Sequence, residues 1–182
     1  MAANRVRIIG GLWRSRLIEF PNNAGVRPTS DRIRETLFNW LGQDLTGQTC
    51  LDLFAGSGAL GFEALSRGAQ AVVMVESDRS AYLALLENAR RLGANHLQVH
   101  AMDAERFLRQ DHLKYDVIFL DPPYKDTDFM GLMRDIAPHL ATQGLLYVEN
   151  SVVLAPPEDL ELLRHKRAGS VHAHLMRKAS RA

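Results

Sequence analysis

The stretch DLFAGSGALG, residues 52–61, joins the end of an apolar run to three closely spaced glycines. The run TCLDLF, residues 49–54, has the composition of a buried strand, and residues 59–67 have the pattern of a helix. Glycines between a strand and a helix let backbone N–H groups approach a ligand and let the helix pack closely on the strand. The stretch therefore predicts a strand, a ligand-binding turn and a helix, the first unit of an α/β fold.

The same alternation of strand and helix continues as far as residue 150. Four more strand-like runs follow, AVVMVES (71–77), LQVHAMD (97–103), YDVIFLD (115–121) and GLLYVEN (144–150), with helical patterns at 80–92, 104–110 and 128–140. Near-continuous apolar strands separated by helices are typical of a parallel sheet covered on both faces. The tail predicts a final hairpin that turns at Ala168 and Gly169, so that the expected sheet has seven strands and is mostly parallel.

A hairpin is also predicted before the alternating region. The segment VRIIGGLWRSRLIEF, residues 6–20, reads as two short strands around Gly10 and Gly11. Its second strand would carry Arg14 and Arg16 on one face, because side chains two positions apart share a face of a strand.

The segment RPTSDRIRETLFNWLGQ, residues 27–43, predicts a helix that Thr29, Ser30 or Asp31 caps and that Gly42 ends. At 182 residues the chain suits one domain. We expect residues 1–25 to form a hairpin appendage and residues 26–182 to form the core of that domain.

The net charge of +1 hides a strong asymmetry along the chain. Residues 1–40 have an excess of four basic residues and residues 162–182 an excess of six, whereas the middle has an excess of nine acidic residues. Basic ends suit a polyanion such as RNA, although solvated surface charge is the simpler alternative. The single cysteine and the lack of any apolar run of about 18 residues predict a cytoplasmic protein that does not enter a membrane.

Three carboxylates at predicted strand ends indicate an adenosine-type cofactor. Glu76 lies twenty residues after Gly56, where it could accept hydrogen bonds from ribose hydroxyls in a dinucleotide site or in an S-adenosylmethionine site. Asp52, four residues before Gly56, favours S-adenosylmethionine, because it would repel a pyrophosphate and attract an ammonium or sulfonium group. A nicotinamide-dependent oxidoreductase is the alternative. Asp103 could bind the adenine amino group or cap the next helix.

The fourth alternating strand ends in DPPY, residues 121–124. Two prolines stop a strand and restrict the backbone beside them, which is the simplest explanation of the motif. The Asp121 carboxylate and the Pro122 carbonyl could also accept both hydrogens of a nucleobase amine and so turn its delocalised lone pair toward a methyl donor. Tyr124 would then offer a ring on which an extruded base stacks.

DPPY after the glycine stretch resembles the signature of methyltransferases that act on amines of adenine, cytosine or guanine. The blocks RIIGGLWRSRLIEFP (7–21) and VRPTSDRIRETLFNWL (26–41) resemble, more narrowly, the bacterial 16S ribosomal RNA guanine-N2 methyltransferases of the small subunit. The resemblance spans Arg5 to Lys178 and implies a Rossmann-like class I methyltransferase fold with S-adenosylmethionine as cofactor.

The resemblance also implies a substrate and partner. The family methylates guanine 966 of 16S rRNA in the small ribosomal subunit or its assembly intermediate, and we expect a monomer. The alternatives are another base amine, either N6 of adenine in DNA or RNA or N2 of a guanine in 23S rRNA, and a non-catalytic assembly factor on the same fold.

Roles for individual residues follow from the resemblance. Asp121, Pro122 and Tyr124 would hold the target amine. The cofactor would be bound by Thr29, Asp52, Phe54, Gly56, Gly58, Glu76 and Asp103. RNA would be bound by Arg5, Arg7, Arg14 and Arg16, while Arg32 and Arg34 either contact RNA or are solvated helix positions. His172 and His174 share a strand face but have no third ligand nearby in the sequence, so no metal is predicted.

Overall fold

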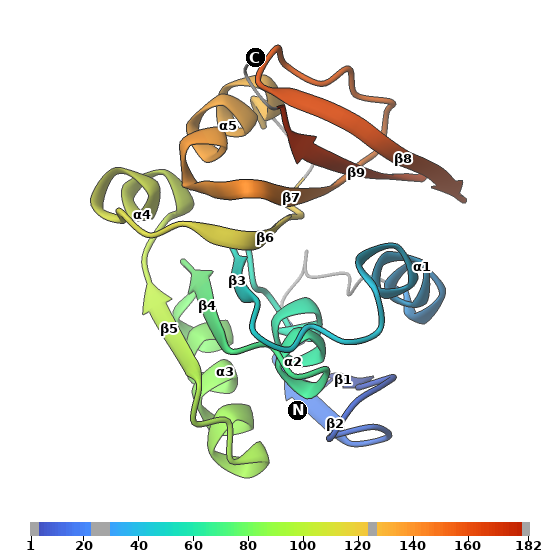
Figure 1. Ribbon diagram of the computed structural model, residues 1–182. Coiled ribbons are helices and arrows are strands. Elements are labelled where there is room, and N and C mark those ends of the chain that lie inside the picture. The colour runs from blue at the N-terminus through green and yellow to red at the C-terminus, as the bar shows by residue number, and fades with distance from the viewer. Residues whose placement is uncertain (1–3, 23–29, 124–126, 180–182) are drawn as a thin grey trace.

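The computed structural model describes residues 4–22, 30–123 and 127–179, and a seven-stranded sheet forms its centre (Figure 1). The strand order is β5-β4-β3-β6-β7-β9-β8. The strands are β3 (Thr49–Asp52), β4 (Ala71–Glu76), β5 (Leu97–Ala101), β6 (Tyr115–Leu120), β7 (Leu140–Asn150), β8 (Leu160–Ala168) and β9 (Val171–Lys178). Strands β3 to β7 pair in parallel, and β9 is antiparallel to β7 and β8. The predicted sheet is confirmed.

Helices cover both faces of this sheet, as predicted. Apolar side chains of α1 (Asp31–Leu41), α2 (Ala59–Ser66) and α3 (Arg79–Leu92) join one buried cluster with one face of the sheet. Those of α4 (Ala104–Gln110) and α5 (Phe129–Ile136), which the short η1 (Ala137–His139) follows, join a second cluster on the other face. Among the described residues, no helix is both long enough and apolar enough to cross a membrane.

The N-terminal hairpin consists of β1 (Asn4–Arg7) and β2 (Leu17–Phe20), which form their own two-stranded sheet. It lies against α3, where the Asn88 side chain accepts from the backbone N–H of Glu19 and donates to the carbonyl of the same residue. The two strands pair with each other and pack against α3, and this packing keeps so short a hairpin attached to the core.

The second strand of the hairpin is shorter than predicted. Arg14 and Arg16 precede β2, so the prediction that a strand presents both side chains on one face is wrong. The connection is instead held on the end of α2, because the Leu12 N–H donates to the Ser66 carbonyl at 2.6 Å. Gly11 permits this approach: its φ is +74°, and a Cβ there would collide with the Ser66 carbonyl.

Helix α1 begins and ends where its sequence predicts. Ser30 is the N-cap, and its side chain accepts from the backbone N–H of Ile33 at 3.4 Å, while Gly42 follows the last helical residue. Apolar side chains of the helix pack into the core, with Leu37 and Phe38 fully buried. Thr29, another predicted cap and cofactor ligand, lies outside the described residues.

The C-terminal hairpin turns one residue later than predicted, at Gly169 and Ser170, because Ala168 still pairs with Val171. His172 and His174 of β9 share a face, as predicted, and stack with His165 of β8 at ring-centroid distances of 5.2 and 4.8 Å. In the described part of the chain, no group of three or more His, Cys, Asp or Glu side chains has the geometry of a metal site.

Candidate functional site

The carboxyl ends of three parallel strands bring the predicted cofactor and catalytic residues to one edge of the sheet. Asp52 is the last residue of β3, which pairs with β4 on one side and with β6 on the other. Glu76 ends β4, and Asp121 follows the last residue of β6. Ligands of open α/β sheets bind beyond such strand ends. The sequence therefore predicted correctly that these three carboxylates lie at the carboxyl ends of strands.

The glycine turn between β3 and α2 is held in place by β4. The Gly56 N–H donates to Oε2 of Glu76 at 2.8 Å, and the Ala55 N–H donates to the Val75 carbonyl at 2.9 Å. Gly58 caps α2 with a φ of +79°, and a Cβ at this position would lie 2.6 Å from the side chains of Leu85 and Phe62. Only glycine therefore fits at this position, because φ is positive and the side chains beneath the turn leave no room for a Cβ.

Asp52 lies beneath this turn and is 3% exposed. Its Oδ2 accepts from the backbone N–H of Gly61 in α2 at 3.0 Å. Burial raises the pKa of the Asp52 carboxyl to about 7; the bond from Gly61 opposes the rise, and the negative charge of Glu76 adds to it. Ionising a buried carboxyl is costly, and a cationic ligand beside it would stabilise the ionised form.

Glu76 and Asp103 both shape the backbone around the site. Besides its bond to Gly56, Glu76 accepts from the Asp78 N–H through Oε1 at 2.7 Å. Asp103 caps α4 through a 2.7 Å bond from the Arg106 N–H, so the capping alternative is confirmed and its adenine contact stays a prediction.

Phe54, the remaining described cofactor candidate, is half-buried and packs with Met102 against the cluster under α4.

The DPPY loop begins where the sequence predicts. β6 ends at Leu120; the next residue, Asp121, is half-buried, Pro122 is buried and Pro123 is exposed. The Pro123 carbonyl accepts from the hydroxyl of Thr127. Tyr124 lies outside the described residues, so its stacking role stays a prediction.

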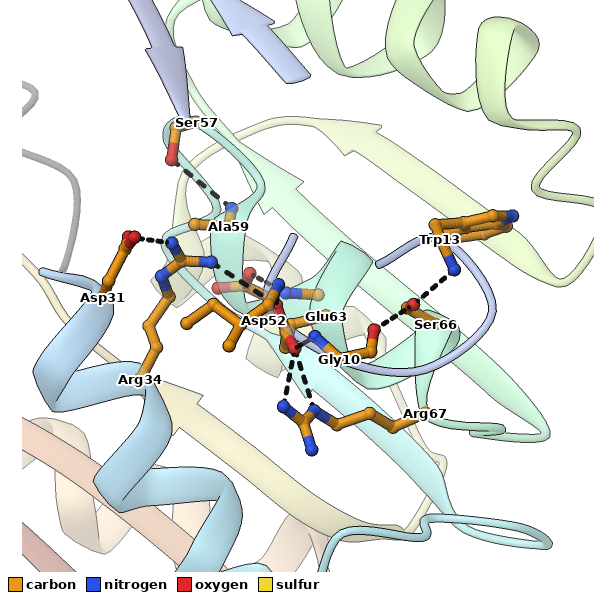
Figure 2. A network of polar contacts seen from close by, with 12 residues as sticks. Gly10, Trp13, Asp31, Arg34, Asp52, Ser57, Ala59, Glu63, Ser66 and Arg67 are labelled. Carbon is orange, nitrogen blue, oxygen red and sulfur yellow. Dashed lines mark hydrogen bonds and ion pairs between the residues drawn. The ribbon is translucent and has the colours of Figure 1, made fainter. Parts of the chain in front are cut away.

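A buried ionic network links the hairpin, α1 and α2 (Figure 2). At its centre is Glu63, which is fully buried. Its Oε1 accepts from the Gly10 N–H at 2.7 Å and from Nε of Arg67 at 2.9 Å, and its Oε2 accepts from the Ile9 N–H at 2.8 Å. Nη1 of Arg34 lies 3.4 Å from the same Oε2. Two cations and two amides thus satisfy one buried carboxylate.

Arg34 is therefore neither available to RNA nor solvated, so both of its predicted alternatives are wrong. The side chain is 0% exposed and also pairs with Oδ1 of Asp31 at 2.5 Å. The physical reason is Glu63, whose charge needs a nearby cation when it is buried. One signal was visible in the sequence: Glu63 interrupts the apolar helix segment 59–65 and lies four residues before Arg67.

The other predicted RNA ligands are exposed, namely Arg5, Arg7, Arg14, Arg16 and Arg32. Two of them also hold the hairpin: Arg5 pairs with Glu19 at 3.1 Å, and Nη2 of Arg16 donates to the Arg91 carbonyl at 2.9 Å. Arg14 borders a polar cavity of about 430 Å³ between the hairpin and α1. Cationic side chains thus surround the hairpin, as an RNA-binding surface requires.

Known proteins are similar to this one over nearly the whole chain. A family model described as Conserved hypothetical protein 95 matches residues 6–177. Ribosomal RNA small subunit methyltransferase D of Escherichia coli is 41% identical over 175 residues, covering 93% of this chain and 88% of that protein. The Haemophilus influenzae protein of the same name is 40% identical over 182 residues, covering 96% and 94%. The solved structure of the putative methyltransferase yhhF from E. coli has a TM-score of 0.90 and 39% identity, covering 98% of this chain and 100% of that one.

Proposed function

Because the chain belongs to the Conserved hypothetical protein 95 family, we propose that it methylates the exocyclic N2 amine of one guanine in 16S rRNA of the small ribosomal subunit. It has a class I methyltransferase fold and uses S-adenosylmethionine. The observation that carries the proposal is the position of Asp121 and Pro122, which follow β6 directly beside the strand that leads into the glycine turn. The earlier resemblance further suggests guanine 966 as the target.

The residues at the strand ends fit this cofactor. The turn at Gly56 and Gly58 has a buried carboxylate, Asp52, on one side and a half-buried carboxylate, Glu76, on the other. We assign Asp52 to the methionine end, Glu76 to the ribose and Asp103 to the adenine. When bound, S-adenosylmethionine supplies a methyl group on a positively charged sulfur.

The chain's own contribution is to orient the acceptor amine. The Asp121 carboxylate and the Pro122 carbonyl accept one amine hydrogen each, which draws the nitrogen lone pair out of conjugation with the ring. The carboxylate also stabilises the positive charge that develops on this nitrogen. Tyr124 completes the proposed site by stacking on the base.

The exposed arginines around the hairpin would bind the phosphates of the rRNA. We therefore retain residues 1–25 as an RNA-binding appendage of a core formed by residues 26–182. An rRNA substrate places the enzyme in the cytoplasm, and we propose that it acts as a monomer on the subunit or its assembly intermediate.

Reversing two of these charges tests the RNA-binding surface. The double substitution Arg14→Glu and Arg16→Glu should weaken RNA binding. It should also make the negative slope of log affinity against log salt concentration shallower by about two, since each phosphate contact contributes about one to that slope. Filter binding of small-subunit rRNA over a range of salt concentrations measures this slope.

The matched control is Arg106→Glu with Arg109→Glu, which makes the same charge change at exposed positions of α4 on the other face of the sheet. Its salt slope should remain that of the wild type. Equal slopes in all three proteins would show that the hairpin does not bind the RNA backbone.

The affinity for S-adenosylmethionine should rise with pH. The pKa of Asp52 is raised to about 7, so its carboxyl is mostly neutral below that pH and lacks the charge that an ammonium group requires. Affinity should therefore increase about tenfold per unit between pH 5 and pH 7. Titration calorimetry measures it, with Asp52→Asn as the control that should bind weakly and independently of pH in this range. A flat profile for the wild type would contradict the proposed contact.

Mass-spectrometric mapping of rRNA tests the function as a whole. Small-subunit rRNA from a strain that lacks this protein should lose one N2-methylguanosine, and the purified protein should restore it. Loss of a methyladenosine instead would overturn the assignment of guanine as the target base. Loss of a methylguanosine from 23S rRNA would overturn the assignment of 16S rRNA as the substrate. Binding of NAD(H) in place of S-adenosylmethionine would support the oxidoreductase alternative, and unchanged rRNA would support a non-catalytic assembly factor.

A further inference from the structure

Glu149, near the end of β7, is a buried carboxylate next to the proposed amine-binding position. It is 2% exposed, and its Oε1 accepts from the hydroxyl of Tyr147 at 2.8 Å. Strands β6 and β7 lie side by side in the sheet (Figure 1). In their parallel pairing, Leu120 is opposite Val148. The next residues along the chain are Asp121, directly after the end of β6, and Glu149, which is still in β7. Paired strands lie about 4.8 Å apart, so these two residues start from neighbouring positions.

The two carboxylates also belong to the same face of the sheet. Phe119 and Tyr147 are paired across β6 and β7, and their rings lie 6.5 Å apart on the face that α1 covers. Side chains alternate along a strand, so the residue two positions after each of these belongs to the same face. Asp121 and Glu149 are those residues.

Guanine is the nucleobase that offers three adjacent N–H donors on one edge. Two are the hydrogens of its N2 amine, which Asp121 and Pro122 accept in the proposed function, and the third is N1–H. Adenine and cytosine have an unprotonated ring nitrogen next to their amines, which is an acceptor. A site that selects guanine therefore needs one more acceptor beside the pair that holds the amine.

We propose that Glu149 accepts the hydrogen bond from N1–H of the target guanine and so determines the specificity of the enzyme for this base. The strand order supports this position, because β6 lies between β3, which leads to the glycine turn, and β7. A base whose amine is held at the end of β6 and faces that turn extends over the end of β7. The inference rests on the proposed guanine-N2 activity and names the residue that would select the base.

The same carboxylate would reject the other bases. Adenine or cytosine would place a lone pair against the Glu149 oxygens and leave a buried charge without a donor from the base. Sites built to bond a substrate hydrogen discriminate strongly against analogues that lack it. The hydrogen bond from Tyr147 holds the carboxylate in this position.

The test compares guanine with 2-aminopurine, which has the same exocyclic amine but an unprotonated N1 and no O6. Small subunits are reconstituted with 16S rRNA that carries either base at the mapped position, and kcat/KM for methyl transfer is measured on both. The wild type should prefer guanine by about 10- to 100-fold. Glu149→Gln should lower kcat/KM on guanine by about the same factor and bring the ratio of the two substrates close to one.

Two further variants separate specificity from structure. Tyr147→Phe keeps the carboxylate but removes the hydrogen bond that holds it. Its preference for guanine over 2-aminopurine should therefore lie between those of the wild type and Glu149→Gln. Glu161→Gln changes an exposed carboxylate on β8 that pairs with Arg177, and its ratio should equal that of the wild type. Because both substrates are measured on one preparation, the ratio does not depend on the folded fraction.

The outcomes distinguish this inference from the function on which it rests. An active wild type whose ratio is unchanged by Glu149→Gln, even if both rates fall, would overturn the role of Glu149 and leave the guanine-N2 activity intact. A wild type that does not methylate guanine would overturn the proposed function itself, and the role of Glu149 with it.

Discussion

Asp121→Ala should lower kcat for methyl transfer by about 100- to 1,000-fold, which is the usual effect of removing one preorganised group that stabilises charge in a transition state. The amine would lose the acceptor that orients its lone pair and the negative charge that offsets its developing positive charge. Cofactor and RNA binding should be largely retained, because β4 bonds the glycine turn through Glu76 and Val75 and the arginines surround the hairpin. Single-turnover rates with saturating cofactor and RNA measure the chemical step, and calorimetry measures binding.

Asp121→Asn is the matched variant for this prediction. It keeps the shape of the side chain and one acceptor oxygen but removes the charge, so its rate should lie between those of Asp121→Ala and the wild type. A near-normal rate for Asp121→Ala would refute the orienting role. Loss of cofactor binding in either variant would instead indicate that Asp121 supports the cofactor site.

Glu63→Ala should lower the free energy of unfolding by about 3–5 kcal/mol, the usual cost of removing one partner from a buried ion pair. Arg34 and Arg67 would remain in the interior without their shared carboxylate, and the amides of Ile9 and Gly10 would lose their acceptor. Urea denaturation followed by circular dichroism measures the change in unfolding free energy.

The control for this variant is Glu87→Ala on α3. Glu87 also pairs with an arginine, Arg90 at 2.7 Å, but this pair is on the surface. Water solvates both of its charges, so the midpoint of denaturation should stay at the wild-type value. Similar midpoints for the two alanine variants would show that burial of the Glu63 network adds no stability.

The alternating strands and helices were predictable because each has a local pattern. Apolar runs such as YDVIFLD need no partner to be recognised as strands, and Ser30 and Gly42 mark the ends of α1 by local hydrogen bonding and conformation. The order of elements therefore follows from the sequence, and so does the edge at which Asp52, Glu76 and Asp121 meet, since parallel strands end on one side.

The environments of charged residues could not be predicted in the same way. Whether Arg34 faces solvent depends on Glu63 and on the amides of Ile9 and Gly10, which reach it from two other elements. Likewise, the pairing of Leu120 with Val148, from which we infer that Asp121 and Glu149 are close, exists only because β7 lies beside β6 in the sheet. Such contacts depend on tertiary packing, which local periodicity does not encode.

Helix α2 has only eight residues and is roughly 12 Å long, yet its two ends lie at the two different binding sites that we propose. Gly58 at its start belongs to the cofactor turn, while Glu63 and Ser66 hold the hairpin that we assign to RNA. A displacement of the hairpin by RNA would be transmitted along one rigid element to the cofactor. Any such coupling is reciprocal: if RNA tightens the binding of S-adenosylmethionine by some factor, the cofactor must tighten the binding of RNA by the same factor.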